Sequence, residues 1–406
     1  MPSLIKNVKT IDNEKIDLEI NNAEGLVIDA GHLIALPALI DPHVHFRTPG
    51  LEHKEDWRTA AKASIYGGYT TVFDMPNTVP ATITTELLQQ KKAVIDAQLK
   101  EIGIPLRYQL FFGADKNHLT EIYKVKDAVV GIKVFMGCST GNLVIDDDNS
   151  LHAVFAIAAS LNMLVAVHAE DEHMLKERKA NYKAPLNYNS HSELRPVEAA
   201  VCAVEKAIAL TRIYGTKLYI LHVSSADEIN LIRKAKQEGL PVFAETTPHH
   251  LFLHTGDYEK WGGKVVMNPP LRDKSHQAAL FQAIHDGTLD TLGTDHAPHT
   301  TTEKNQPYGT CPCGVPGIET ALPLLLNAYH EKLLSLEEIV ALTSKNARKI
   351  FDLPSNNDMV LVDLNKQKTV SDQQLKTKCG WSPFTGRTLK GWPVYTILKG
   401  HLYDLT

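Results

Sequence analysis

The sequence predicts an α/β fold, a (β/α)8 TIM barrel with a small β-sandwich domain formed by both chain termini. Two observations predict it. From about residue 37, apolar strand-like runs alternate with amphipathic helix-like segments, whereas short β-like runs occupy both ends of the chain. Parallel strands need helical crossovers, and eight such units close into a barrel. We therefore expect a barrel domain at 37–354 and a β domain built from 1–36 and 355–406, with an open, doubly wound sheet as the alternative.

The alternation can be followed along the chain. Each predicted barrel strand is a short apolar run bounded by polar or turn-forming residues. The eight runs are 36–45, 69–75, 108–113, 129–136, 163–169, 218–223, 242–247 and 291–295. The amphipathic segments predicted as helices are 54–66, 86–99, 196–214, 225–238, 275–286, 336–342 and 344–351. After them, strand-like runs at 359–364, 394–399 and 402–403 predict the C-terminal half of the β domain.

Composition and charge exclude several classes of protein. A chain of 406 residues exceeds the usual size of a single core, which favours one large domain beside a smaller one. The net charge of -5 gives no general attraction to nucleic acid or to an anionic membrane, and no apolar run is long enough to span a bilayer. Five scattered cysteines and the lack of a signal-peptide core favour a reducing compartment. We therefore expect a cytoplasmic protein that binds neither nucleic acid nor a membrane.

Side chains that can bind a metal gather at the ends of the predicted strands. His43 and His45 end the first strand, and because successive strand residues alternate between faces, both imidazoles project the same way. The active site of such a barrel forms at the C-terminal ends of its strands, so these side chains should share one rim. The rim residues, in chain order, are His43, His45, Lys133, His168, His222 and Asp295.

This set of residues suits two metal ions. Imidazole and carboxylate donors suit zinc or a similar divalent ion, and four histidines exceed what one catalytic zinc uses. Two neighbouring cations need a bridging group, which the ammonium form of Lys133 cannot supply. A buried lysine has a lowered pKa, and carbon dioxide could convert its neutral amine to a carbamate with one oxygen for each metal. A buried Lys133 that pairs with a carboxylate or reaches water is equally open on these grounds.

Further polar residues on the rim could act on a substrate. Asp295 can serve as a metal ligand or as a proton shuttle, with a helix N-cap as the alternative. Arg47 follows the histidine pair, and a guanidinium beside metal ions suggests an anionic substrate. Asn77 and Asn268 follow the second and seventh strands, where a turn residue beside proline is the alternative.

Several sequence blocks at these strand ends, and one near the C-terminus, form a recognisable combination. They read DPHVHFRTPG from residue 41, MPNT from 75, MNPPLR from 267, TDHAPH from 294 and CGWSPF from 379. In this combination the chain resembles the dihydroorotases of the amidohydrolase superfamily, in a long-chain branch with a carboxylated lysine, over nearly its whole length. The resemblance implies a (β/α)8 barrel with a binuclear zinc site.

The resemblance also implies roles for individual residues. The first Zn²⁺ would be held by His43, His45 and Asp295, and the second by His168 and His222, with carboxylated Lys133 and a hydroxide as bridges. The implied substrate-binding residues are Arg47, Asn77, Asn268 and His299, together with the backbone at Cys313 and Gly314. Many bacterial members of the long-chain branch have an aspartate in place of the lysine. The acidic run at 146–148 is therefore the alternative, although the position of Lys133 on the fourth strand favours the lysine.

The function implied by the resemblance is a step of pyrimidine (UMP) synthesis, the reversible cyclisation of N-carbamoyl-L-aspartate to L-dihydroorotate. In the hydrolytic direction, a metal-bridging hydroxide would attack the cyclic amide, and Asp295 would carry a proton to the leaving nitrogen. Allantoinases and dihydropyrimidinases share the metal ligands, but their neutral substrates need no guanidinium such as that of Arg47. An inactive homologue that serves as a scaffold is the alternative of another class. The expected partner is the small-molecule substrate, and a homodimer is left open.

Overall fold

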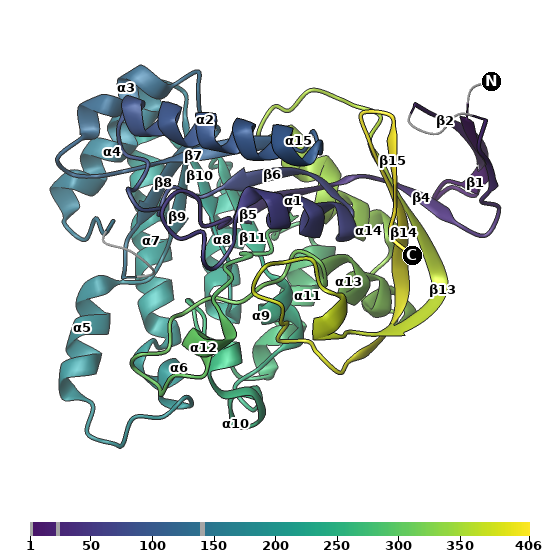
Figure 1. The fold of residues 1–406 in the computed structure, drawn as a ribbon. Coiled ribbons are helices and arrows are strands. Elements are labelled where there is room, and N and C mark those ends of the chain that lie inside the picture. Colours follow the sequence, from purple (N-terminus) through teal and green to yellow (C-terminus); the bar gives the residue numbers. More distant parts are fainter. Residues whose placement is uncertain (1–2, 22–24, 139–142) are drawn as a thin grey trace.

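The computed structural model describes residues 3–21, 25–138 and 143–406. Within these residues, eight parallel strands curl into a barrel with helices on its outside, and a second sheet lies beside the barrel (Figure 1). The first and last strands of the chain, purple and yellow, meet in this second sheet. The predicted fold class is therefore confirmed.

The barrel strands follow one another in chain order, and every neighbouring pair is parallel. They are β5 (Leu39–Val44), β6 (Tyr69–Asp74), β7 (Arg107–Gly113), β8 (Gly131–Phe135), β9 (Leu164–His168), β10 (Lys217–Ile220), β11 (Val242–Thr246) and β12 (Thr291–Leu292). A parallel bridge between Val44 and His296 joins the first strand to the segment after the last one. The backbone N–H of His45 donates to the carbonyl of His296 at 2.8 Å, which closes the ring.

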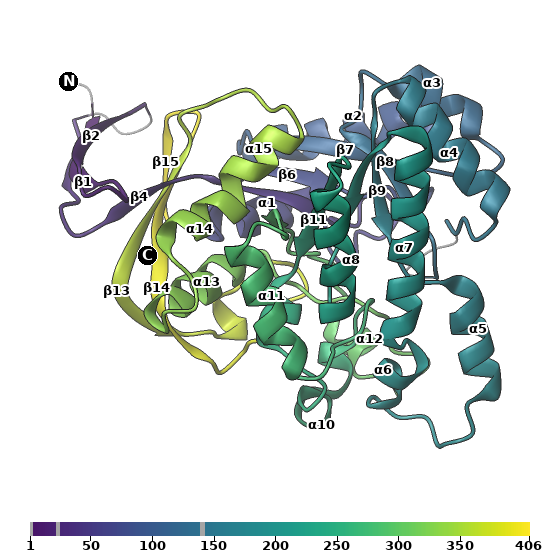
Figure 2. The same ribbon diagram turned by 180° about the vertical axis from the view of Figure 1, so that it is seen from behind.

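Helices cover the outside of the barrel, and Figure 2 shows α7, α8 and α11 from behind. The described helices are α1 (Trp57–Tyr66), α2 (Thr85–Ile102), α3 (Ile122–Val125), α4 (Asp148–Ser160), α5 (Glu172–Asn181), α6 (Ser190–Leu194), α7 (Val197–Tyr214), α8 (Ala226–Gln237), α9 (Pro248–Phe252), α10 (Asp257–Trp261), α11 (Ser275–His285), α12 (Thr301–Lys304), α13 (Ala321–His330), α14 (Leu336–Val340) and α15 (Asn346–Ile350). Aliphatic side chains between strands and helices form the main core. None of the helices in the described part of the chain is long and apolar enough to cross a membrane.

The second sheet has seven strands in the order β15-β14-β13-β4-β1-β2, with β3 paired to β1. Its N-terminal strands are β1 (Ser3–Lys9), β2 (Lys15–Ile20), β3 (Val27–Asp29) and β4 (Ile34–Pro37), and its C-terminal strands are β13 (Met359–Thr369), β14 (Thr388–Leu398) and β15 (His401–Asp404). Pairing of β4 with β13 joins the two ends of the chain. A separate small core, which includes Ile5, Val8, Leu33 and Leu361, lies against this sheet.

Three predicted strand boundaries in the barrel are wrong by three residues, and one of them is the end of the sixth barrel strand, which lies at Ile220 rather than at residue 223. The first barrel strand begins at Leu39 rather than at residue 36, because Leu36 pairs with Val360 in the other sheet. An uninterrupted apolar run hides this change of sheet in the sequence. The last strand, predicted for 291–295, contains only Thr291 and Leu292. The chain leaves the ladder there, and Asp295 adopts a left-handed backbone conformation with φ of 44°.

Candidate active site

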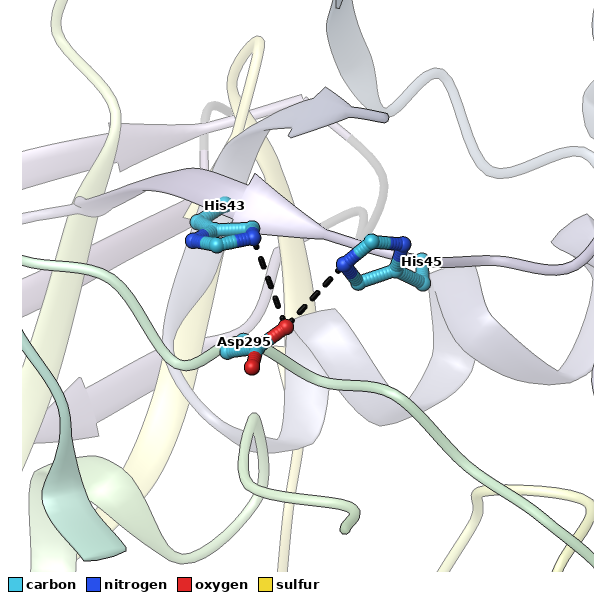
Figure 3. A group of neighbouring side chains, drawn as sticks. All are labelled: His43, His45 and Asp295. Atoms are coloured by element: carbon cyan, nitrogen blue, oxygen red, sulfur yellow. Dashed lines mark ion pairs between the residues drawn. The ribbon is translucent and has the colours of Figure 1, made fainter. Parts of the chain in front are cut away.

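Three buried side chains that can bind a metal meet at the C-terminal end of the barrel (Figure 3). His43 belongs to β5, His45 follows that strand, and Asp295 follows β12 at the other end of the strand order. The Oδ1 atom of Asp295 lies 3.3 Å from Nε2 of His43 and 3.0 Å from Nε2 of His45. Closure of the barrel therefore brings these sequence-distant residues together.

Each of the two histidines has an oxygen beside its Nδ1 that can accept a proton from that nitrogen. Nδ1 of His43 lies 2.5 Å from Oε1 of Glu245, and Nδ1 of His45 lies 2.8 Å from Oδ1 of Asn77. Burial lowers the pKa of His43 to about 3 and that of His45 to about 4, so both rings are neutral. A neutral ring that donates from Nδ1 has its lone pair on Nε2. Both lone pairs therefore face Asp295.

This convergence fits a divalent cation. Two lone pairs and a carboxylate oxygen repel one another in a buried site unless a positive charge lies among them. In a tetrahedral zinc site with bonds of about 2.0–2.1 Å, neighbouring ligand atoms are about 3.3 Å apart. The separations of 3.3 and 3.0 Å around Asp295 agree with that spacing. The chemistry of the three donors and their spacing thus both suit a metal ion.

A second pair of nitrogens lies beside the first group. Nδ1 of His168 is 2.9 Å from Nε2 of His222, and the ring centroids of His43 and His222 are 5.4 Å apart. Nε2 of His168 lies 3.0 Å from Glu170, whose carboxylate is also held by Arg195, so the His168 lone pair belongs to Nδ1. Nδ1 of His222 is buried and has no hydrogen-bond partner among the described residues. These two histidines could hold a second ion.

Lys133 lies in β8, 1% exposed, among these groups. Burial lowers the pKa values of His43, His168 and His222, and the charge of Lys133 adds to this effect. Its Nζ lies 4.5 Å from the ring centroid of Phe135, and no carboxylate of the described chain pairs with it. Burial lowers the pKa of Lys133 to about 7. The alternative of a lysine paired with a carboxylate thus has no support in the described residues.

Arg47 lies at the edge of the metal-binding group with its guanidinium buried. Its side chain is 2% exposed, its Nε donates to the carbonyl of Pro298 at 3.0 Å, and one of its terminal nitrogens lies 3.0 Å from Nε2 of His299. Burial lowers the pKa of Arg47 to about 10, which leaves it charged at neutral pH. No carboxylate in the described part of the chain lies within ion-pair distance of it. A buried cation without an anionic partner is suited to an anionic ligand.

Three of the remaining predicted substrate residues, Cys313, Gly314 and Asn77, lie beside His299 or His45. The carbonyl of Cys313 is 3.0 Å from Nε2 of His299, and Gly314 packs so closely that a Cβ there would lie 2.6 Å from the carbonyl oxygen of Ala297. Asn77 contacts His45, so one role of its amide is to orient that ring.

Asn268 lies near Cys313 through their common neighbour His191, whereas the acidic run at 146–148 lies at the surface. The Oδ1 of Asn268 lies 3.0 Å from Nε2 of His191, and Asn268 lines a cavity of about 680 Å³ together with Cys313. The acidic run is exposed, where Asp147 caps α4 and its two neighbours pair with surface lysines. The geometry therefore favours Lys133 over the acidic run as a bridging residue.

Sequence reasoning missed two carboxylates that support the histidines, Glu245 and Glu170. Glu245 is fully buried and accepts a hydrogen bond from the hydroxyl of Tyr219 at 2.8 Å. Its carboxylate has room because residue 293 is a glycine, since a Cβ there would lie 2.4 Å from the carboxylate. The available signal was a glutamate at the end of an apolar strand. Backbone strain, which is visible only in the structure, also marks this site: Arg47, His222 and Asp295 each have a positive φ that non-glycine residues rarely adopt.

The chain belongs to the amidohydrolase family, which matches residues 34–402. It is thus an enzyme of the cyclic amide hydrolase class. Within this class it is 35% identical to a dihydroorotase of Methanosarcina acetivorans, over 97% of this chain and 87% of that protein. It is 33% identical to a dihydroorotase of Methanosphaera stadtmanae, over 98% of this chain and 95% of that protein. The resemblance inferred from the sequence blocks is confirmed.

Solved structures give a complementary comparison. The L-hydantoinase (dihydropyrimidinase) of Arthrobacter aurescens superimposes with a TM-score of 0.91 at 27% identity, covering 99% of this chain and 96% of that one. A dihydropyrimidinase of Brevibacillus agri NCHU1002 gives a TM-score of 0.87 at 28% identity, covering 99% and 95%. The fold is therefore common to enzymes named for different cyclic amides, and the substrate must be argued from the site.

The contact between Glu245 and His43 predicts an effect on metal binding. Glu245→Leu removes the acceptor that holds the Nδ1 proton of His43, and should lower the affinity for zinc by about 10- to 100-fold. Glu245→Gln keeps an acceptor at the same place and should have a smaller effect. Zinc titration of the metal-depleted variants, with circular dichroism to verify the fold, measures both. Equal affinities in the wild type and the leucine variant would exclude this role for Glu245.

Proposed function

We propose that this enzyme is a zinc-dependent dihydroorotase, which interconverts N-carbamoyl-L-aspartate and L-dihydroorotate in pyrimidine synthesis. One observation carries the proposal: the buried guanidinium of Arg47 lies beside the metal-binding group and has no carboxylate partner in the described part of the chain. L-Dihydroorotate carries a carboxylate on its cyclic amide, and the planar fork of an arginine matches the two oxygens of that group. The dihydroorotase relatives support the same substrate.

The proposed cofactor is a pair of Zn²⁺ ions. His43, His45 and Asp295 would hold the first and His168 and His222 the second, with Lys133, as the carboxylated lysine, bridging both. Support comes from the converging lone pairs around Asp295 and from a buried lysine that no carboxylate of the described chain neutralises. Bound there, the ions would supply Lewis acidity and lower the pKa of a water molecule.

The residues of the chain then have distinct tasks. The Asp295 carboxylate can accept a proton from the attacking water and deliver it to the ring nitrogen that leaves. Arg47 and His299 would bind the substrate carboxylate and so hold the ring amide toward Asp295. The close approach of the backbone at Gly314 leaves little room above His299 and would exclude water from the bound ring. The proposed substrate residues Asn77, Asn268 and Cys313 would complete this rim.

A second candidate function is hydrolysis of a neutral cyclic amide. The superposition on the L-hydantoinase of Arthrobacter aurescens favours it, because the two enzymes share the fold over nearly their whole lengths. Such a ring offers no carboxylate to Arg47, and binding it would leave a buried cation uncompensated. The rim of this enzyme therefore supports the anionic substrate.

A turnover assay of the zinc-loaded enzyme separates these functions. We expect hydrolysis of L-dihydroorotate with a kcat/KM at least about 100-fold above those for dihydrouracil, hydantoin and allantoin, because a site built for a charged group rejects analogues that lack it. Preferential turnover of a neutral ring would replace the proposal by the second candidate. A zinc-loaded chain that turns over none of these substrates would indicate a scaffold.

Replacement of Arg47 tests the proposed carboxylate contact. Arg47→Ala should lower kcat/KM for L-dihydroorotate by about 100-fold or more, because truncating one partner of a buried charge pair costs about 2–5 kcal/mol. Zinc content should be preserved, since the guanidinium is no metal ligand. The control is Arg58→Ala, which removes a partly exposed arginine paired with Glu101 on the outside of the barrel. An Arg47→Ala variant as active as this control would contradict the proposal.

The proposed modification of Lys133 can be observed directly. Enzyme loaded with zinc in ¹³C-bicarbonate should show a carbamate carbon resonance that is absent from the Lys133→Met variant. That variant should also bind less zinc, because the bridge between the two ions is lost. A two-zinc enzyme without the carbamate signal would show that Lys133 is not the bridge.

A further inference from the structure

His299 is fully buried at the substrate rim, and both of its ring nitrogens have close neighbours. Nε2 lies 3.0 Å from the carbonyl oxygen of Cys313 and 3.0 Å from a terminal nitrogen of Arg47. Nδ1, the other ring nitrogen, lies 2.9 Å from Nζ of Lys54. Arg47 and Lys54 lie in the loop between β5 and α1, whereas His299 and Cys313 lie on either side of α12, between β12 and α13.

The neighbours determine which ring nitrogen carries the proton. A lysine ammonium has three donors and no acceptor, so Nδ1 must accept from Lys54. The proton of a neutral His299 is then on Nε2, where it can donate to the carbonyl of Cys313. Burial and the nearby charges of Arg47 and Lys54 hold the pKa of His299 well below its usual value, which keeps the ring neutral.

The same tautomer has a consequence for Arg47. With a proton on Nε2, the contact at 3.0 Å between His299 and Arg47 places one N–H donor beside another and is not a hydrogen bond. The terminal N–H of Arg47 then makes no hydrogen bond to His299, and the Nε2 proton, which lies beside the Cys313 carbonyl, can be shared with an anionic oxygen of the substrate. The opposite tautomer would accept a hydrogen bond from Arg47, consume one of its donors, and turn the Nδ1 proton against the Lys54 ammonium.

Lys54 is itself held in place. Its ammonium pairs with Oε1 of Glu303 at 2.9 Å, and its backbone N–H donates to the carbonyl of Leu51. Glu303 in turn closes a capping box with Thr300 at the start of α12. Since Lys54 contacts Nδ1, and Arg47 lies at Nε2, the ammonium is on the far side of the ring from the proposed carboxylate position. Lys54 therefore acts on the ring and not on the substrate.

We propose that Lys54 is a positioning residue that fixes His299 as its Nε2–H tautomer, so that His299 and Arg47 together donate to the carboxylate of the substrate. The inference rests on the proposed function and adds the origin of its selectivity. A neutral cyclic amide has no carboxylate to accept from both donors, and its carbonyl oxygens would leave the buried charge of Arg47 uncompensated, which costs binding energy. Glu303 and Lys54 would thus contribute to substrate choice without touching the substrate.

The tautomer can be measured on the wild-type enzyme. Long-range ¹H–¹⁵N correlation spectra of the zinc-loaded enzyme, labelled in its histidines and assigned with His299→Gln, should show His299 with a bare Nδ1 and a protonated Nε2. In Lys54→Met this preference should be lost, whereas Lys54→Arg, which keeps a donor, should retain it. A wild-type His299 protonated on Nδ1 would overturn the proposal without any kinetic measurement.

Kinetics test the consequence for substrate binding. Lys54→Met should raise KM for L-dihydroorotate by roughly 10- to 100-fold, the effect expected for a charge-assisted hydrogen bond, with a smaller change in kcat. Lys62→Met, which removes an exposed lysine of α1, is the matched control. The double variant Lys54→Met/His299→Ala should be no worse than His299→Ala alone, because Lys54 acts through that ring.

The outcomes separate this inference from the proposed function. If the wild type does not turn over L-dihydroorotate, the proposed function fails, and the carboxylate role assigned to His299 fails with it. If the wild type is active but Lys54→Met has the KM of the Lys62→Met control, only the role of Lys54 is refuted. Effects of Lys54→Met and His299→Ala that multiply in the double variant would also refute it. Melting temperature and zinc content of each variant verify that the fold is retained.

Discussion

The contact on which the site depends is the closure of the barrel between its first and last strands. Asp41 connects the two strands through its buried carboxylate. This group accepts hydrogen bonds from the backbone N–H of His43 at 3.1 Å, from the backbone N–H of Thr294 at 3.0 Å and from the hydroxyl of Thr294 at 2.5 Å. Burial raises the pKa of Asp41 to about 8, yet three donors satisfy the group. Residues 41 and 294 directly precede the two segments that carry the metal-binding group. The contact that closes the ring therefore also sets the distance between His43 and Asp295.

The chemistry of the rim follows from burial combined with a definite partner for each ring. Burial lowers the pKa of each rim histidine, namely His43, His45, His168, His222 and His299, so that each ring is neutral. The hydrogen bond on one ring nitrogen then determines whether the other directs a lone pair or a proton into the site. Glu245 and Asn77 direct lone pairs of their histidines inward, toward a cation. Lys54 does the reverse for His299, because it occupies the lone pair of Nδ1 and leaves the proton on Nε2, beside Arg47 and the Cys313 carbonyl. One physical rule thus accounts for the convergence of nitrogens around Asp295 and for the donors around Arg47 on neighbouring loops.

The barrel could be predicted from the sequence because it follows from periodicity, and its strand ends indicated which histidines could share one rim, whereas the roles of these residues came from the family resemblance. Strand ends of a parallel barrel share one rim, so a histidine such as His168 at the end of an apolar run can be placed without knowing the tertiary structure. The start of the first strand could not be placed, because Leu36 and Leu39 are equally apolar while they belong to different sheets. Glu245 and Lys54 were missed for another reason: their roles depend on the rings that they contact, and those partners are 202 and 245 positions away along the chain.

The two comparisons point to different substrates, and the charge of the rim explains how one fold can serve both. Strands and helices superimpose on a hydantoinase, so the barrel itself carries no information about the ring that is bound. The features that can distinguish one ring from another lie in the loops after β5 and β12. Arg47, Lys54 and the buried Lys304 lie around His299, and Glu303 neutralises Lys54. Lys304 donates to three backbone carbonyls, among them that of Gly314 at 2.9 Å, and so holds the loop that covers the rim. Arg47 is left as the cation without a carboxylate partner in the described part of the chain, and in the proposed function the carboxylate on the cyclic amide would supply that charge.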